Sequence, residues 1–142
     1  MVVSNRERVG RAIELLGVGL GPYVDRRMTR HSTVGGNWKA AYAGKNVDSD
    51  DSDASALISA ILDNWQYVFR EHLRNKGRSW LGEAKDCQNN WAHNVNFSDP
   101  ETERALNTVE LLLNLIDAPE AAEVGRLWQG CSGPWTNVRT TA

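Results

Sequence analysis

A polar segment near the middle of the chain combines residue types that can bind and cleave a phosphodiester. It reads Lys85-Asp86-Cys87-Gln88-Asn89-Asn90-Trp91-Ala92-His93. Asn89 and His93 are four residues apart, so a helix places them on one face, and Lys85 extends that face by one turn. Histidine can take or give a proton near neutral pH, while an amide and an ammonium can hold phosphoryl oxygens. A plain alternative stays open, because a histidine at the C-terminal end of a helix also serves as a cap.

The charge pattern around this segment allows a local basic face. The whole chain has a net charge of −2, which argues against a strong binder of duplex nucleic acid. Residues 67–98 nevertheless carry five Lys or Arg against three acidic residues. The five are Arg70, Arg74, Lys76, Arg78 and Lys85. We therefore expect Lys85 and Arg78 to contribute to substrate binding.

The N-terminal third of the chain predicts two helices and a long loop. Apolar residues at helical spacing mark a first helix from about Asn5 to Leu20. The glycine-rich segment 17–21 is expected to end this helix, because glycine is a weak helix former. Pro22 suits a first helical turn and predicts a second helix over Pro22–His31. Residues 32–52, rich in Gly, Ser, Asn and Asp, predict a loop.

The rest of the chain also predicts helices, and the expected fold is an all-α antiparallel bundle of five to six helices. An apolar stripe over residues 57–73 predicts a third helix that ends at Asn75-Lys76-Gly77. The polar segment belongs to a fourth helix, from about Ser79 to Ala92. Ser98 and Glu101 form a capping box for a fifth helix. Its apolar face consists of Leu106, Val109, Leu112, Leu113 and Ile116. Pro119 starts a last short helix to about Trp128.

Several single residues carry further expectations. Trp65 and Trp91 lie on helical stripes and are predicted to be core residues. Trp38 and Trp135 lie in expected loops, where one could stack on a base or pack against a partner. His72 is predicted to lie on the surface. We expect Cys87, which lies within a predicted helix, to be a reduced and partly buried thiol.

Length and composition predict one globular domain with a substantial core. The chain has 142 residues, of which 41% are hydrophobic and 24% are charged. We expect residues 1–128 to form the helical domain and residues 129–142 to be a flexible tail or linker. The sequence has no apolar run of membrane-spanning length and no signal-peptide pattern, so a cytoplasmic location is expected. The cysteines have no metal-binding spacing, and no metal or other cofactor is expected.

Taken together, the helical pattern and the segment Gln88-Asn89-Asn90-Trp91-Ala92-His93-Asn94-Val95-Asn96-Phe97-Ser98-Asp99 resemble the HEPN superfamily. These are small helical domains linked to RNA cleavage and RNA binding. The likeness is closest to the subgroup found beside ATPase, helicase or RNase modules in RNA-processing and prokaryotic defence proteins. Its typical segment reads Arg-Asn-x-x-Ala-His and continues into a Phe-Ser turn. Residues 20–24 and 61–65 also look like this subgroup, and the likeness spans roughly residues 10–118.

The resemblance implies a metal-independent endoribonuclease without a cofactor. In the family, the ribose 2′-hydroxyl attacks the adjacent phosphate and leaves a 2′,3′-cyclic phosphate and a 5′-hydroxyl. Carried onto this chain, His93 is the acid–base residue, and Asn89 orients it or the phosphate. The family's site forms between two subunits, so the resemblance implies a homodimer through the helix that carries residues 79–93. The implied substrate is single-stranded or structured tRNA-like RNA, and the implied roles are those of a toxin or a phage-defence protein.

One catalytic position departs from the family pattern, because Gln88 stands where the family has arginine. Arginine neutralises the growing charge on the phosphorane, whereas glutamine donates one hydrogen bond and carries no charge. Losing one such preorganised donor costs about 10²–10³ in rate. Three readings follow: a weakened or switched-off ribonuclease, an RNA-binding or dimerisation module that never cleaves, or an active enzyme in which Lys85 supplies the cation. A further alternative is an adaptor within a larger ATPase or helicase-type protein.

Overall fold

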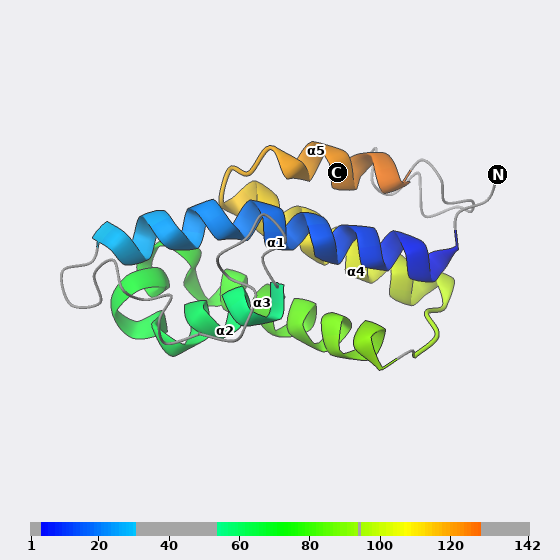
Figure 1. The fold of residues 1–142 in the computed structure, drawn as a ribbon, viewed down its shortest axis with the longest axis horizontal. Coiled ribbons are helices and arrows are strands. Elements are labelled where there is room, and N and C mark those ends of the chain that lie inside the picture. The colour runs from blue at the N-terminus through cyan, green and yellow to red at the C-terminus, as the bar shows by residue number, and fades with distance from the viewer. Residues whose placement is uncertain (1–3, 31–53, 94, 129–142) are drawn as a thin grey trace.

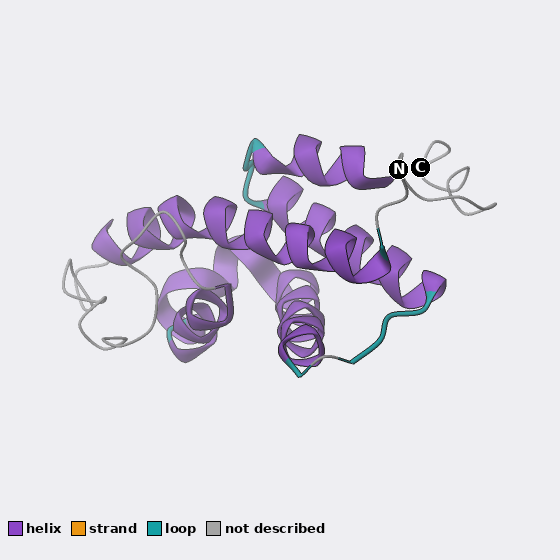
Figure 2. Ribbon diagram, turned by 45° about the vertical axis from the view of Figure 1, so that its right-hand side comes forward, coloured by secondary structure: helices purple, strands orange, loops and turns teal. Residues whose placement is uncertain are grey.

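The chain folds into an all-α bundle, as the apolar pattern predicts. The structure is a computed structural model that describes residues 4–30, 54–93 and 95–128. The helices are α1 (Asn5–Arg30), α2 (Ala54–Asp63), a π-helical turn (Trp65–Phe69), α3 (Arg70–Ala92), α4 (Asp99–Leu115) and α5 (Glu120–Leu127). The described ranges contain no β-strand (Figure 2). The expected loop 32–52 and the expected tail 129–142 lie outside the described residues, as do His31, Trp38 and Trp135.

Helix α1 is the centre of the bundle. It contacts each of the other helices, with α5 along one side and α2 and α3 along another (Figure 1). The core between them is continuous from Ala12 in α1 to Trp128 after α5. Its largest fully buried side chains include Leu16, Leu20, Met28, Phe69, Leu81 and Leu113. The position of α1 explains how residues near the N-terminus come to contact the polar segment of α3.

The glycine-rich segment 17–21 lies inside α1, so the predicted helix end and the separate helix from Pro22 are both wrong. Packing explains the glycine, because a Cβ built on Gly19 would overlap Cδ2 of Leu113. The missing side chain lets α1 approach α4 closely. Pro22 removes one helical N–H, and the carbonyl it would have bonded belongs to Val18. Val18 and Pro22 are both exposed, which keeps that carbonyl on the solvent side of α1.

Two glycines predict opposite effects for the same substitution. Alanine is favoured over glycine inside a helix by about 0.8–1.0 kcal/mol. Nothing lies within 4 Å of a Cβ built on Gly82 of α3, so we expect Gly82→Ala to stabilise the fold by about that amount. At Gly19 the contact with Leu113 forces repacking, which costs about 1–3 kcal/mol. Urea unfolding of both variants measures the difference, and a Gly19→Ala variant more stable than the wild type would contradict the close packing of α1 on α4.

The apolar stripe over residues 57–73 does not form one helix as predicted. Helix α2 ends at Asp63, and a π-helical turn follows before α3 begins. A π-helical turn accommodates one extra residue, so the register of the buried face changes there. Trp65 and Phe69 are buried on the inner side of this turn, while Tyr67 between them is 77% exposed. The stripe is therefore a core stripe, as expected, but it crosses two helices.

Helix α3 ends at Ala92 as predicted, yet it begins earlier than the expected Ser79. The chain bends at Arg74, whose φ of 60° and ψ of −177° are not helical. The predicted helix end at Asn75-Lys76-Gly77 is confirmed to within one residue, because two helical segments meet at Arg74. Gly77 is buried within α3, where a Cβ would lie 3.0 Å from Cδ2 of Leu115 in α4.

The two C-terminal helices follow the sequence prediction. Ser98 and Glu101 form the expected capping box, with the Ser98 N–H donating to Glu101 Oε1 at 2.9 Å and the Glu101 N–H donating to Ser98 Oγ at 3.2 Å. All five residues of the expected apolar face of α4 are buried. Pro119 precedes α5, as predicted.

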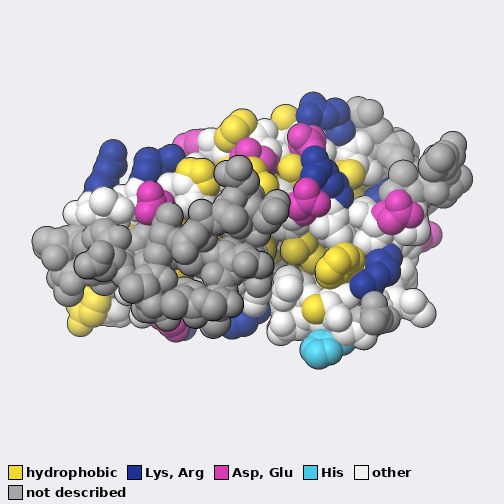
Figure 3. All heavy atoms as spheres, viewed as in Figure 1, with side chains coloured by type: hydrophobic (Ala, Val, Ile, Leu, Met, Phe, Trp, Pro, Cys, Tyr) yellow, Lys and Arg dark blue, Asp and Glu magenta, His cyan; other side chains and the backbone are white. Residues whose placement is uncertain are grey.

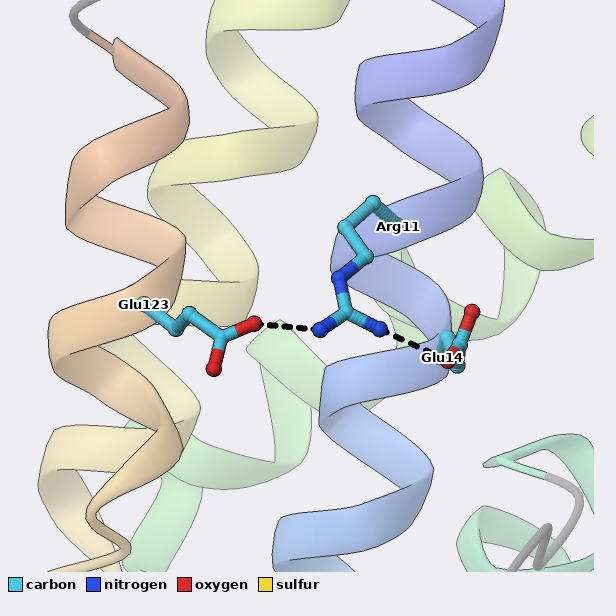
Figure 4. Close-up of polar contacts among 3 residues, drawn as sticks. All are labelled: Arg11, Glu14 and Glu123. Atoms are coloured by element: carbon cyan, nitrogen blue, oxygen red, sulfur yellow. Dashed lines mark hydrogen bonds and ion pairs between the residues drawn. The ribbon is translucent and has the colours of Figure 1, made fainter.

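An ion-pair cluster fixes α5 beside α1. The Arg11 guanidinium of α1 binds Glu14 at 2.7 Å and also binds Glu123 of α5 (Figure 4). These groups are partly exposed, so the cluster contributes less to stability than the core does. Among the described residues, no helix is both long enough and apolar enough to cross a membrane.

Candidate functional site

His93 lies at the surface, directly at the end of α3. It is the C-cap residue, and its backbone N–H donates to the Asn89 carbonyl at 3.0 Å. The side chain is exposed. The exposed residues Val95 and Asn96 follow it. The imidazole is therefore free to meet a ligand from outside the bundle.

The structure places Asn89 with His93 but separates Gln88 from both. Asn89 is exposed one helical turn before His93, on the same face of α3. Gln88 is half-buried, and its position is rotated about 140° from that of His93 around the helix axis. A long side chain at residue 88 could still curl toward the exposed face, whereas the shorter glutamine has less reach.

Lys85 lies on the same side of α3 as Asn89, yet its ammonium already has a partner. Lys85 is half-buried, and its Nζ donates to Oγ of Ser59 in α2 at 3.3 Å. A lysine that replaces the family's arginine would have to leave this hydrogen bond. The contact thus weakens the reading in which Lys85 supplies the missing cation.

Arg78 does not join the group around His93. Its guanidinium lies over the ring of Trp65, with 5.5 Å between Cζ and the ring centroid. Arg78 also precedes His93 by about four helical turns, or about 22 Å along α3. Trp65 itself is buried, which confirms its predicted core position.

An interaction that the sequence did not reveal holds the His93 end of α3 against α1. Nη2 of Arg6 donates to the Trp91 carbonyl at 2.8 Å, and Nε1 of Trp91 donates to the Arg6 carbonyl at 3.1 Å. The Arg6 guanidinium also lies over the Trp91 ring, 4.7 Å from its centroid. A Cβ built on Gly10 would lie 2.9 Å from Nε1 of Trp91, so glycine there makes room for the ring. We call these contacts the Arg6–Trp91 clamp.

The structure corrects the predicted burial of Trp91 and adds Arg6 to the candidate site. Trp91 is half-buried and packs on the surface of α1, so it is not a fully buried core residue. Arg6 is separated from Trp91 by 85 positions in the chain, so local sequence patterns gave no signal for the contact. Asn5 extends the same attachment, because its Nδ2 donates to the Phe97 carbonyl at 3.1 Å and to Asp99 Oδ1 at 2.8 Å.

The groups on the α4 side of α3 have structural roles. Cys87 is a free, half-buried thiol, as expected, and burial raises its pKa to about 11. A pKa that high leaves little thiolate to act as a nucleophile near neutral pH. The hydrogen bond from Arg104 holds the pKa of Glu83 below its usual value, and Thr108 also donates to Glu83 at 3.0 Å. Glu83 therefore stays ionised and joins α3 to α4, so it does not serve as a proton donor.

His72 is not the surface residue that the sequence predicted. It is half-buried, and its Nδ1 lies 2.7 Å from the hydroxyl oxygen of Tyr23 in α1. Burial lowers the pKa of His72, and the positive charge of Arg27 acts in the same direction, while Asp117 opposes them. Burial raises the pKa of Tyr23 to about 12. The pair is thus a neutral contact between α1 and α3.

The lowered pKa of His72 predicts a loss of stability on acidification. The unfolded chain binds a proton at the usual histidine pKa of 6.5, whereas the folded chain binds it only at lower pH. The neutral ring therefore contributes its stability above that pH, and the contribution is lost as the pH falls below it. We expect the free energy of unfolding to fall less steeply on acidification in a His72→Gln variant than in the wild type. Parallel pH profiles in urea unfolding would contradict the assignment.

Among the described residues, no group of three or more His, Cys, Asp or Glu side chains is arranged to hold a metal ion. What the site offers is an exposed imidazole, an exposed amide and a helix end that is anchored to α1.

The comparisons with known proteins agree with this picture of a helical domain. The family profile described as Swt1-like HEPN matches residues 11–117, which is close to the likeness expected over residues 10–118. No curated protein and no solved structure gives a significant match. Because the family match covers well over half of the sequence, and the bundle is all-α as that family requires, the chain belongs to the Swt1-like HEPN family.

Proposed function

We propose that this domain acts on RNA through the exposed end of α3, as a metal-independent endoribonuclease whose activity is weakened by Gln88. The observation that carries the proposal is the placement of His93, which is exposed at the end of a helix fixed by the Arg6–Trp91 clamp. Asn89 is exposed on the same face, one turn away. A proton-transfer group on a fixed helix end is what a positioned acid–base catalyst needs.

The proposed reaction needs no outside reagent. His93 takes the proton of a ribose 2′-hydroxyl, and the resulting oxygen attacks the neighbouring phosphorus. The bond from phosphorus to the 5′-oxygen breaks, and that oxygen takes up a proton from water, while the protonated His93 returns its proton to the solvent. The products are a 2′,3′-cyclic phosphate and a 5′-hydroxyl. Asn89 orients the phosphate or the imidazole, and Gln88 lends one amide hydrogen bond in place of a charge.

We further propose that two copies complete the site through the exposed face of α3. Helical geometry puts Gly82 on the same side of α3 as Asn89 and His93, and a Cβ there meets nothing within 4 Å. A second helix could approach closely at such a position. Sedimentation of Gly82→Glu tests this, because a charged side chain would disrupt a packed dimer without disturbing the fold. Gly82→Ala is the matched control, and a dimer that survives Gly82→Glu unchanged would place the interface elsewhere.

Cleavage of RNA in excess EDTA tests the function itself. The proposal predicts slow cleavage by this chain, products that end in 2′,3′-cyclic phosphate, and no cleavage by His93→Ala. Lys85→Ala is predicted to retain the slow activity, because its ammonium binds Ser59. If RNA binds but no variant cleaves it, the domain is an RNA-binding module. If RNA does not bind even at low salt, the remaining reading is an adaptor of a larger ATPase or helicase-type protein.

A further inference from the structure

A second basic region lies at the opposite end of α3 from His93. The last turn of α1 and the π-helical turn border a groove, whose charged lining residues are Arg27, Arg30, Arg70 and Glu71. Three arginines against one glutamate give this lining a formal charge of +2. Figure 1 shows this end of α1 beside the turn between α2 and α3, and Figure 3 shows dark blue basic side chains at the end of α1. We call this feature the arginine groove.

The basic lining continues along α3 beyond the arginine groove. Arg70 and Glu71 also line an adjoining hollow, together with Arg74 and Asn75. Within the described part of the chain, neither Arg30 nor Arg70 forms an ion pair with a carboxylate. Guanidinium groups that are not neutralised by the protein can bind phosphate oxygens in pairs.

An exposed aromatic ring accompanies these charges. Tyr67 lines the arginine groove and is 77% exposed, although Trp65 and Phe69 on either side are buried. The π-helical turn produces this outward position, and π-helical turns occur often at functional sites. A flat ring beside a basic groove is the arrangement that binds single-stranded nucleic acid, with bases stacked on the ring and phosphates on the arginines.

The backbone of this region adopts a costly conformation. The φ and ψ of Arg74 fall in a region that is almost reserved for glycine. Such conformations cluster at binding and catalytic sites, where the rest of the fold holds them in place. Arg74 separates the start of α3, which carries Arg70, from the rest of that helix.

We propose that the arginine groove binds a strand of single-stranded RNA, with phosphates on Arg27, Arg30 and Arg70 and a base on Tyr67. The choice of RNA over DNA rests on the proposed function. The basic charge and the exposed ring by themselves favour single-stranded nucleic acid of either kind. An acidic peptide could use the arginines but would gain little from the exposed ring. The groove lies at the opposite end of α3 from His93, so it anchors the strand away from the site of cleavage.

Fluorescence anisotropy with a labelled 2′-O-methyl oligouridine tests the proposal, because this probe binds but cannot be cleaved. We expect Tyr67→Ala to weaken binding about tenfold or more, and Tyr67→Phe to keep affinity within about twofold. Each lost phosphate contact lowers the salt slope of the logarithm of affinity by about 0.7, so Arg30→Gln with Arg70→Gln should lower it by about 1.4. Arg126→Gln on α5 is the matched control and should change neither quantity.

Arg74→Gly separates binding from folding. Glycine adopts the backbone conformation of residue 74 without strain, so we expect a higher midpoint of thermal unfolding. The variant also loses a guanidinium from the adjoining hollow, so we expect weaker RNA binding. A DNA oligonucleotide of the same sequence shows whether the ribose matters.

Three outcomes would overturn the proposal: full affinity in all groove variants, no binding of the probe at low salt, or binding of polyglutamate that needs the arginines but not Tyr67. Cleavage that depends on His93 but not on the groove variants would overturn the groove alone and leave the proposed function standing.

Discussion

Gln88→Arg is expected to raise the rate of RNA cleavage by about 10²–10³, which corresponds to about 3–4 kcal/mol of transition-state stabilisation. On the proposed match of Gln88 to the family's motif arginine, the substitution supplies a charged, bidentate donor. Gln88 is half-buried on a neighbouring face of α3, and an arginine there is long enough to reach the exposed face beside Asn89. Single-turnover cleavage of RNA in EDTA measures the gain.

Two control variants make this result specific. Gln88→Lys adds a charge without the bidentate geometry of arginine, so it should recover only part of the gain. His93→Ala in the Gln88→Arg background should remove the activity, because the proton-transfer group is then missing. If Gln88→Arg cleaves no faster than the wild type, charge at residue 88 does not limit the reaction, and the weakened-ribonuclease reading fails.

Trp91→Ala is expected to have the second large effect, on stability and activity together. The variant loses half-buried aromatic area, one hydrogen bond and the contact with the Arg6 guanidinium, which together amount to about 2–3 kcal/mol. In the Gln88→Arg background the end of α3 would also lose its fixed position. A displacement of about 1 Å at a catalytic group can cost about 10²-fold in rate. Urea unfolding and single-turnover cleavage measure the two effects.

Trp91→Phe separates packing from hydrogen bonding in the Arg6–Trp91 clamp. It keeps a ring over Gly10 and under the Arg6 guanidinium, but it removes the Nε1–H donor, so the loss of stability should be only about 1 kcal/mol. Arg6→Ala should lower the rate of RNA cleavage about as much as Trp91→Ala does. Cleavage that is unchanged in Trp91→Ala would show that the clamp does not position His93.

The features that sequence analysis predicted correctly depend on neighbouring residues. The capping box of α4 needs only Ser98 and Glu101, and the apolar face of α4 repeats at regular helical spacing. The exposed pair of Asn89 and His93 follows from their separation of four residues in a polar helix, although their chemistry stays a prediction.

The features that it missed depend on distant contacts. The sequence predicted a helix end near Gly19, whereas the structure shows that this position needs a glycine because Leu113 packs against it. The Arg6–Trp91 clamp joins residues far apart in the chain, and only the glycine at residue 10 hints that a large ring must fit there. The π-helical turn follows from keeping both Trp65 and Phe69 in the core, which apolar periodicity alone does not resolve.

The most direct test of the account is an NMR titration of the histidine side chains with uncleavable 2′-O-methyl RNA. If His93 contacts the phosphodiester, its imidazole signals should move on binding. A His93→Gln variant, which lacks this ring, identifies the His93 signals. RNA that saturates the domain while the His93 signals stay unchanged would contradict the claim that this histidine acts on RNA.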